Sequence, residues 1–301
     1  MLRGERDHAR QVLEAAIDIG FEGFSTKTGF GANSDLWTVS RISRLLNLLD
    51  EHGFRELQLK AVELLESFLK YSPDSNARED ALYLVFIALL DLGELEDALS
   101  TADRMTRSVS KWVMYGDVAV AQAEARRTDE ALATAERVGN ATFRVKAKAR
   151  VAAVLAEQGR IELAKDVLPS QASDIEVNNA HKAIASALAA NGEINEAIAY
   201  ANAISGMFQR AFVQDSLSGV LAEAGELEAA VALAKSISVR QQRAQALATV
   251  GEVLVAGGEI ELARAVLAEM PRTALWQDPV DESVEESRAR LERALSSATS
   301  Q

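Results

Sequence analysis

Apolar residues recur at helical spacing along most of the chain and are interrupted at regular intervals by a short polar turn. One such segment has Ile184, Ala185, Leu188 and Ala189 before Gly192, and Ile194, Ala197, Ala201 and Ile204 after it. Spacings of three, four and seven residues predict an amphipathic helix on each side of the glycine. We therefore predict a helical hairpin whose turn contains this glycine, because glycine tolerates the left-handed conformation that ends many helices.

The turn recurs with a period of 33 residues. We call the residue in the place of this glycine the turn residue, and its six positions are Gly93, Arg126, Gly159, Gly192, Gly225 and Gly258. Five residues after each turn residue comes an alanine, at Ala98, Ala131, Ala164, Ala197, Ala230 and Ala263. A fixed period of this length is typical of solenoids, in which each hairpin buries its apolar face against its neighbours.

The first helices of most hairpins carry small residues and leucines at fixed places. Small residues lie seven and three positions before the turn residue, at Ala119 and Ala123, Ala152 and Ala156, Ala185 and Ala189, Ser218 and Ala222. Leucine lies four positions before it, at Leu89, Leu155, Leu188, Leu221 and Leu254. Such a stripe lets two helix backbones approach closely, so we expect these residues in the core.

Outside the repeats the chain changes character. We expect an N-terminal helix and a Gly/Phe-rich loop over residues 1–36, and a divergent helical hairpin over 37–78. Six repeats occupy 79–270, and a polar capping helix follows over 271–301. Terminal caps shield the last repeats of an array from water. Two interpretations of the loop at 21–35 stay open, an ordered loop packed by its phenylalanines and a mobile segment.

The repeat resembles the tetratricopeptide repeat over residues 79–270. Its cleanest copy is Leu217, Ser218, Leu221, Gly225, Ala230, Ala234 and Ile237. The family's first-helix aromatics are mostly replaced, with Tyr115 remaining, its closing proline is absent, and the period is one residue short of 34. The resemblance implies an all-α fold, an α-solenoid forming a right-handed superhelix of antiparallel helical hairpins. Short HEAT-type hairpins are the alternative, whereas an ankyrin array would need a Thr-Pro-Leu-His turn that the chain lacks.

The resemblance also implies a concave face built from residues thirteen, ten, nine and six positions before each turn residue. These include Asp80, Tyr83, Val113, Asp117, Lys146, Arg150, Asn179, Lys182, Phe212, Asp215, Gln245 and Glu252. Three of them, Lys146, Arg150 and Lys182, form a basic group with Asp117 and Asp215 on either side. Unlike charges along a groove favour an oriented polar contact with a partner.

Lys146 and Arg150 match the lysine and arginine with which chaperone-binding members of the family grip a terminal carboxylate. Tyr83, Ile87 and Asp117 stand where the other clamp residues, a lysine and two asparagines, are expected. A chaperone-tail clamp is therefore not predicted, but capture of another acidic or carboxylate-bearing segment is. The alternative is that Lys146 and Arg150 make surface ion pairs, which contribute little to stability.

A second candidate surface is apolar. Aromatic and aliphatic side chains gather at Trp112, Val113, Tyr115, Phe208 and Phe212. They suit an anchor for a partner helix or an extended peptide. Equally, Trp112 fills a gap left where Arg126 replaces glycine.

Charge and composition exclude several function classes. The 301 residues include 45 acidic residues against 32 lysines and arginines, a net charge of −13. Nucleic-acid binding needs clustered basic residues, so it is not expected, although basic protein partners remain possible. Cysteine is absent, which excludes disulfides and thiolate metal sites. The first twenty residues lack the apolar core of a signal peptide, and no apolar run is long enough to span a membrane, so we expect a soluble cytoplasmic protein.

No motif for catalysis or cofactor binding was found. A phosphate-binding loop needs glycine before its lysine, whereas Thr26 precedes Lys27. His8, His52 and His181 have no second ligand at metal-binding spacing. We expect no metal, no cofactor and no enzyme activity. The predicted function is a protein-protein interaction scaffold or adaptor that binds a protein or peptide on its concave face. An accessory subunit that completes or inhibits an enzyme and a catalytic α/α superhelix are the alternatives, and nothing indicates the oligomeric state.

Overall fold

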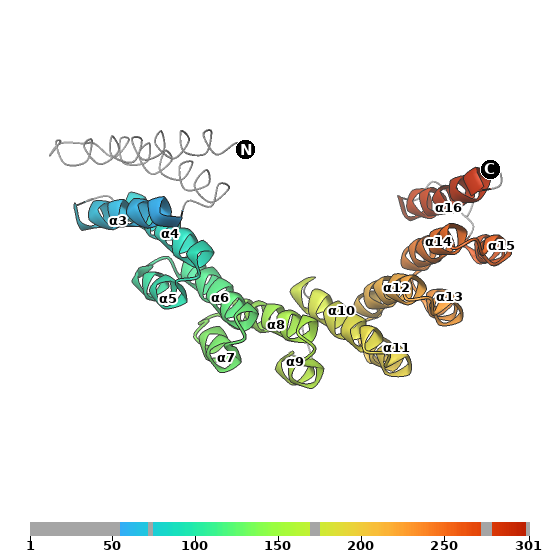
Figure 1. The fold of residues 1–301 in the computed structure, drawn as a ribbon, viewed down its shortest axis with the longest axis horizontal. Coiled ribbons are helices and arrows are strands. Elements are labelled where there is room, and N and C mark those ends of the chain that lie inside the picture. The colour runs from blue at the N-terminus through green and yellow to red at the C-terminus, as the bar shows by residue number, and fades with distance from the viewer. Residues whose placement is uncertain (1–54, 72–74, 169–174, 272–278, 299–301) are drawn as a thin grey trace. The chain divides into compact units, whose positions relative to one another are not determined.

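The computed structural model describes residues 55–71, 75–168, 175–271 and 279–298. Within these ranges the chain forms fourteen α-helices and no strand (Figure 1). The helices are α3 (Arg55–Tyr71), α4 (Ser75–Leu92), α5 (Leu95–Arg104), α6 (Ser108–Glu124), α7 (Thr128–Glu136), α8 (Ala141–Glu157), α9 (Ile161–Val167), α10 (Ile175–Ala190), α11 (Ile194–Ala203), α12 (Met207–Glu223), α13 (Leu227–Ser236), α14 (Arg240–Ala256), α15 (Ile260–Glu269) and α16 (Pro279–Ala298). The prediction of an all-α helical repeat fold is confirmed.

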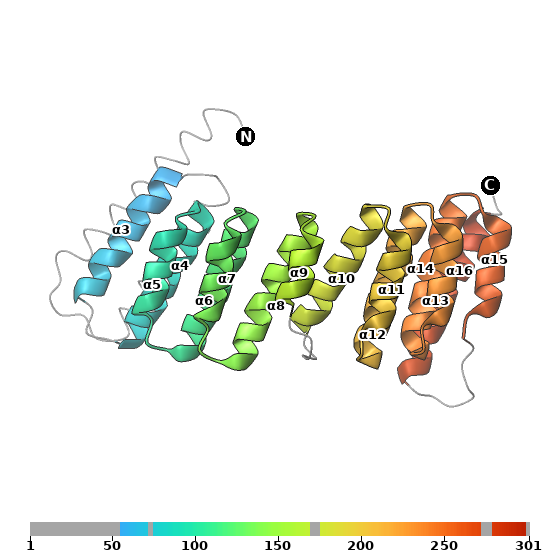
Figure 2. The ribbon, with the colours of Figure 1, turned by 90° about the horizontal axis from the view of Figure 1, so that it is seen from below.

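The helices alternate between two roles. We call α4, α6, α8, α10, α12 and α14 the first helices, and α5, α7, α9, α11, α13 and α15 the second helices. The chain divides into two compact units, and the division falls between Ala147 and Lys148, inside α8. In the second unit α12 packs against both α10 and α14, while α11 and α13 each pack against the first helices on either side of them (Figure 2). In the first unit α5 packs in the same way against α4 and α6.

All six hairpin turns close with the same pair of hydrogen bonds. The amide of Gly225 donates to the carbonyl of Ala222 at 3.0 Å, and the amide of Glu226 donates to that of Leu221 at 2.9 Å. The same two bonds recur at the other five turns and define a Schellman motif. The five turn glycines have φ between 75° and 85°, and Arg126 adopts the same left-handed region at 63°. Because no atom lies within 4 Å of a Cβ built on these glycines, backbone conformation alone selects glycine here.

The small residues of the repeat lie in the core, as predicted. The alanine five positions after the turn residue is fully buried in all six hairpins. The small residues of the first helices and the leucine four positions before the turn residue are buried as well. The α6/α7 hairpin departs from this pattern, because Gln122 takes the leucine position. Gln122 is buried, and its Oε1 has no hydrogen-bond partner.

Basic side chains join successive hairpins, a feature that we did not predict. Fifteen positions before the turn residue, Arg144, Arg210 and Arg243 donate to backbone carbonyls six residues earlier, at Val138, Ile204 and Ile237, over 3.0, 2.8 and 3.4 Å. In the same position Lys111 donates to the carbonyl of Asp103 at 2.8 Å. The last carbonyls of a helix lack partners within it, so these bonds satisfy groups at the ends of α5, α7, α11 and α13.

The two ends of the described chain extend the array. α4 begins at Ser75, four residues before the first repeat was expected, and α3 packs against it. The expected capping helix corresponds to α16, which packs on α14 and buries Leu291 against Gly251. The expected N-terminal helix, the loop at 21–35 and the first helix of the divergent hairpin lie outside the described residues. In the described part of the chain no helix is both long and apolar enough to span a bilayer.

Arg126→Gly should raise the free energy of unfolding. A residue with a Cβ costs about 1 kcal/mol in the left-handed region, and part of that gain is offset because glycine makes the unfolded chain more flexible. We expect a net gain of about 0.5 kcal/mol in urea denaturation. The matched variant Gly225→Ala should lose about 1 kcal/mol. A loss of stability in Arg126→Gly would show that the arginine side chain stabilises the turn.

Candidate partner-binding face on the first helices

Large exposed apolar side chains concentrate on one class of helix. Within the described ranges they are Leu59, Tyr83, Val109, Val113, Ile175, Met207, Phe208 and Phe212. Leu59 lies on α3 and the others lie on first helices, whereas no second helix carries one in the part of the chain that the structure describes. Exposed apolar side chains that concentrate on one class of helix indicate a contact surface within each unit.

One turn-by-turn series of exposed side chains runs along α12. Phe208 is 65% exposed and Phe212 is 38% exposed. Asp215 follows three residues later and is half-buried. Spacings of four and three residues place all three side chains on the same side of the helix. We call Phe208, Phe212 and Asp215 the α12 stripe.

The Asp215 carboxylate lacks a direct partner. Among the described residues, no side chain forms a hydrogen bond or an ion pair with it. Burial raises the pKa of Asp215 to about 6, although Lys182 on α10 and Arg290 on α16 lower it through their charges. Arg290 is itself held by Glu252 of α14, with hydrogen bonds of 3.1 and 2.5 Å. Asp215 is therefore a half-buried acid to which no described residue donates a hydrogen bond.

The structure brings together some of the other predicted face residues. Lys182 is exposed and lies close enough to Asp215 to lower its pKa. Asn179 on α10 and Gln245 on α14 are exposed. Lys182 and Asp215 lie on α10 and α12, which pack against each other.

Four residues of the predicted face lie in the first unit, on α4 and α6. Tyr83 is exposed at the surface of α4 and stacks on Phe86 with ring centres 6.5 Å apart. Val113 is exposed on α6, and Asp117 is half-buried. Asp80 pairs with Arg107 at 3.3 Å.

The predicted basic group spans the division between the units. Lys146 belongs to the first unit and Arg150 to the second, and both are half-buried on α8. The joint action of Lys146, Arg150 and Lys182 on one ligand stays a prediction. Each of the two α8 residues interacts with other parts of the protein, so neither is an isolated charge.

Two aromatic residues that we considered as anchors are structural instead. Tyr115 is buried, and its hydroxyl donates to the Asp103 carboxylate at 2.6 Å, while the Arg137 guanidinium lies 4.6 Å from its ring centre. Trp112 packs on Phe143 with ring centres 5.6 Å apart, at the start of the next hairpin. These contacts join α6 to the helices around it and leave the exposed apolar surface to other residues.

His181 also has a structural environment. Its Nδ1 lies 2.7 Å from the hydroxyl oxygen of Tyr200, so the pair joins α10 to α11. Burial lowers the pKa of His181. Lys165 of α9 lies over the Tyr200 ring at 5.8 Å and pairs with Glu196 at 2.9 Å. Among the described residues no three histidine, aspartate or glutamate side chains gather closely enough to hold a metal ion.

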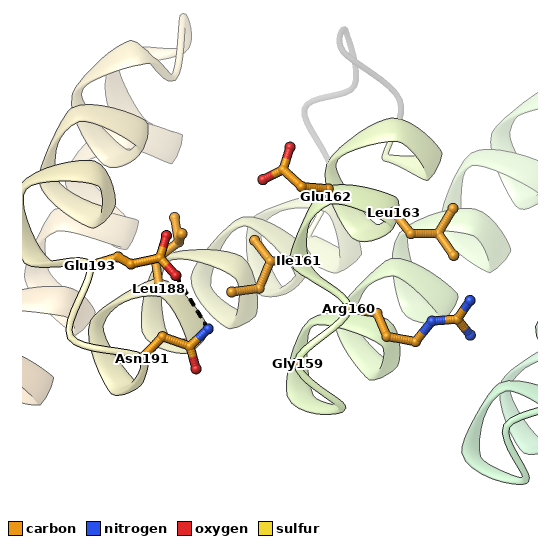
Figure 3. A pocket seen from close by; sticks show the side chains of 8 residues that line it. All are labelled: Gly159, Arg160, Ile161, Glu162, Leu163, Leu188, Asn191 and Glu193. Carbon is orange, nitrogen blue, oxygen red and sulfur yellow. Dashed lines mark hydrogen bonds between the residues drawn. The ribbon is translucent and has the colours of Figure 1, made fainter.

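A shallow pocket of about 360 Å³ lies between the turns of the α8/α9 and α10/α11 hairpins (Figure 3). Ile161 lies toward Leu188 at its centre. At one side the Asn191 amide donates to Glu193 at 3.4 Å, and at the other side Arg160 points away from them. The charged groups do not converge, so the pocket has no arrangement that resembles an active site.

Comparison with known proteins gives little further information. No protein-family model matches the chain. No curated protein matches it either. Among solved structures, the chain is similar to Ton1535 from Thermococcus onnurineus NA1, with 15% sequence identity and a TM-score of 0.29 over 96% of this chain and 98% of that one. A likeness at that TM-score supports no argument about function.

Asp215→Asn should stabilise the protein at neutral pH. The native pKa of Asp215, about 6, lies above the usual value of 3.8, so the folded state binds more protons between these values. Stability attributable to this group is therefore lost as pH rises from about 4 to about 6. One pKa unit corresponds to about 1.4 kcal/mol, and after a discount for partial exposure we expect a gain of about 1–2 kcal/mol at about pH 7.

Urea denaturation at several pH values measures this effect. The difference between Asp215→Asn and the wild type should disappear below about pH 3, where the wild-type carboxyl is protonated in both states. The control is Asp166→Asn on α9, whose side chain is exposed and should show no such dependence. A destabilised Asp215→Asn at neutral pH would mean that the carboxylate makes a favourable contact in the native protein.

Proposed function

We propose that this protein is a non-enzymatic interaction scaffold or adaptor that binds a protein or peptide partner on the exposed side of its first helices. The observation that carries the proposal is the distribution of large exposed apolar side chains, which lie on first helices and not on second helices of the described chain. The resemblance of the repeat to the tetratricopeptide repeat supports it, because that family presents partner-binding residues on its first helices.

A second candidate is an accessory subunit that docks on an enzyme and completes or inhibits it. It is favoured by the occurrence of exposed apolar residues in both units, with Tyr83 and Val113 in the first and Phe208 and Phe212 in the second. A bound peptide needs only a few anchors, whereas subunit assembly buries well over about 1,600 Å². The number of first helices that a partner covers distinguishes the two candidates.

Capture from a lysate of the native host tests the proposal. We expect Phe208→Ser with Phe212→Ser to lose a partner that the wild type retains, as read by mass spectrometry. The matched control is Ala232→Ser with Ala265→Ser, at exposed positions on α13 and α15. Both pairs change exposed residues, so each should keep wild-type helical circular dichroism. If the Ala232→Ser, Ala265→Ser variant fails to capture a partner that the Phe208→Ser, Phe212→Ser variant still captures, the interface lies on the second helices.

A charge variant tests the predicted acidic partner. Lys146→Glu with Arg150→Glu should weaken binding of an acidic or carboxylate-bearing segment, because both cations are replaced by anions. The measurement is the affinity of any captured partner for the folded variant. Unchanged affinity would show that Lys146 and Arg150 do not belong to the binding face. The Phe208→Ser, Phe212→Ser variant would still test the apolar part of that face.

A further inference from the structure

We propose that the α12 stripe binds an amphipathic segment of a partner protein, in which apolar residues cover Phe208 and Phe212 and a lysine or arginine pairs with Asp215. This inference rests on the proposed function and specifies the chemistry of the partner at one place. It differs from the acidic partner expected at Lys146 and Arg150, and the two can be tested separately.

The apolar end of the stripe is formed by two rings one helical turn apart. Phe208 and Phe212 expose 65% and 38% of their surface. Covering apolar surface stabilises a complex by about 25 cal/mol per Å². Met207, also exposed at the start of α12, extends the same end. Rings of this kind also attract cations over their faces, so a basic partner suits both ends of the stripe.

The polar end of the stripe lacks its counter-charge. Asp215 lies three residues beyond Phe212, about 4.5 Å further along the helix axis. Buried carboxylates are ordinarily hydrogen-bonded or paired, but no described residue is bonded to this one. A partner's cation would supply a charge-assisted hydrogen bond at that point.

The cations already present do not take this role. Lys182 is exposed on α10 and makes no ion pair with any described residue, Asp215 included. Arg290 is engaged by Glu252 through two hydrogen bonds. Both reach Asp215 only through longer-range charge interaction. Neither cation bonds the carboxylate, so a partner's lysine or arginine would supply a direct counter-charge that no described residue provides.

The charge of the whole chain favours the same occupant. At a net charge of −13 two copies of the chain repel each other, whereas a basic segment is attracted. The distance from Phe208 to Asp215, about 10 Å along the axis, sets the partner's spacing. A helical partner needs its basic residue about three to seven positions from its apolar anchor, and an extended one about three.

Selection of displayed peptides on the full-length chain tests the inference. The probe is a random library of peptides of about 15 residues, or about 22 Å when helical, which is longer than the stripe. We expect the recovered peptides to combine apolar residues with a lysine or arginine at the stated spacing. A synthetic recovered peptide should bind about tenfold or more weakly to Asp215→Asn, because a charge-assisted bond is lost. Asp166→Asn should bind it as the wild type does.

Charge exchange adds a second readout. Asp215→Lys should reject the basic peptide, and replacing the peptide's basic residue by glutamate should restore binding to Asp215→Lys. Asp215→Asn is expected to be at least as stable as the wild type, so weaker binding to it is not a consequence of unfolding.

The remaining outcomes separate the two proposals. One outcome is that the peptides fail to bind the Phe208→Ser, Phe212→Ser variant but bind Asp215→Asn as they bind the wild type. That result would overturn the cation pairing and leave the proposed function standing. If the peptides bind the Phe208→Ser, Phe212→Ser variant as they bind the wild type, or if no peptide is recovered, both this inference and the proposed function would be overturned. A dimer seen by light scattering and abolished by the phenylalanine pair would identify a second copy as the occupant and overturn the inference.

Discussion

The array depends on a backbone residue in the left-handed region at the end of each first helix. That residue turns the chain through two hydrogen bonds to the helix it ends, and the second helix begins two residues later. The alanine five positions on then lies in the core, where its small size allows close packing. Five glycines and Arg126 produce the same turn, so its geometry is maintained even where the residue type is unfavourable.

The exposed face of the first helices follows from how these helices are buried. α4, α6, α10, α12 and α14 each pack against their own second helix and against a neighbouring first helix. The small residues and the leucine of the repeat are buried on these helices. The side turned away from the second helices is free of that constraint and varies from hairpin to hairpin. On α12 it carries two exposed phenylalanines and an acid that no described residue bonds.

The sequence predicted the hairpins, turns and buried alanines because these depend on residues close together in the chain and repeat every 33 positions. It also assigned Phe212 and Asp215 to the predicted concave face; in the structure Phe212 is exposed and Asp215 is half-buried. It did not reveal that Asp215 lacks a donor, because its neighbours Lys182 and Arg290 come from other helices. The arginines at 144, 210 and 243 share the period and were a signal that we overlooked. Tyr115 looked like an anchor because its burial depends on contacts with Asp103 and Arg137.

Two deletions test whether interchangeable 33-residue units hold the chain together. Removing residues 199–231 joins two second helices at equivalent positions and keeps the register, whereas removing 199–229 rotates the following residues by about 200° about the helix axis. Thermal melting followed by circular dichroism should show a helical, cooperatively melting protein for the first deletion and loss of cooperativity for the second. Equal behaviour of the two deletions would contradict the account.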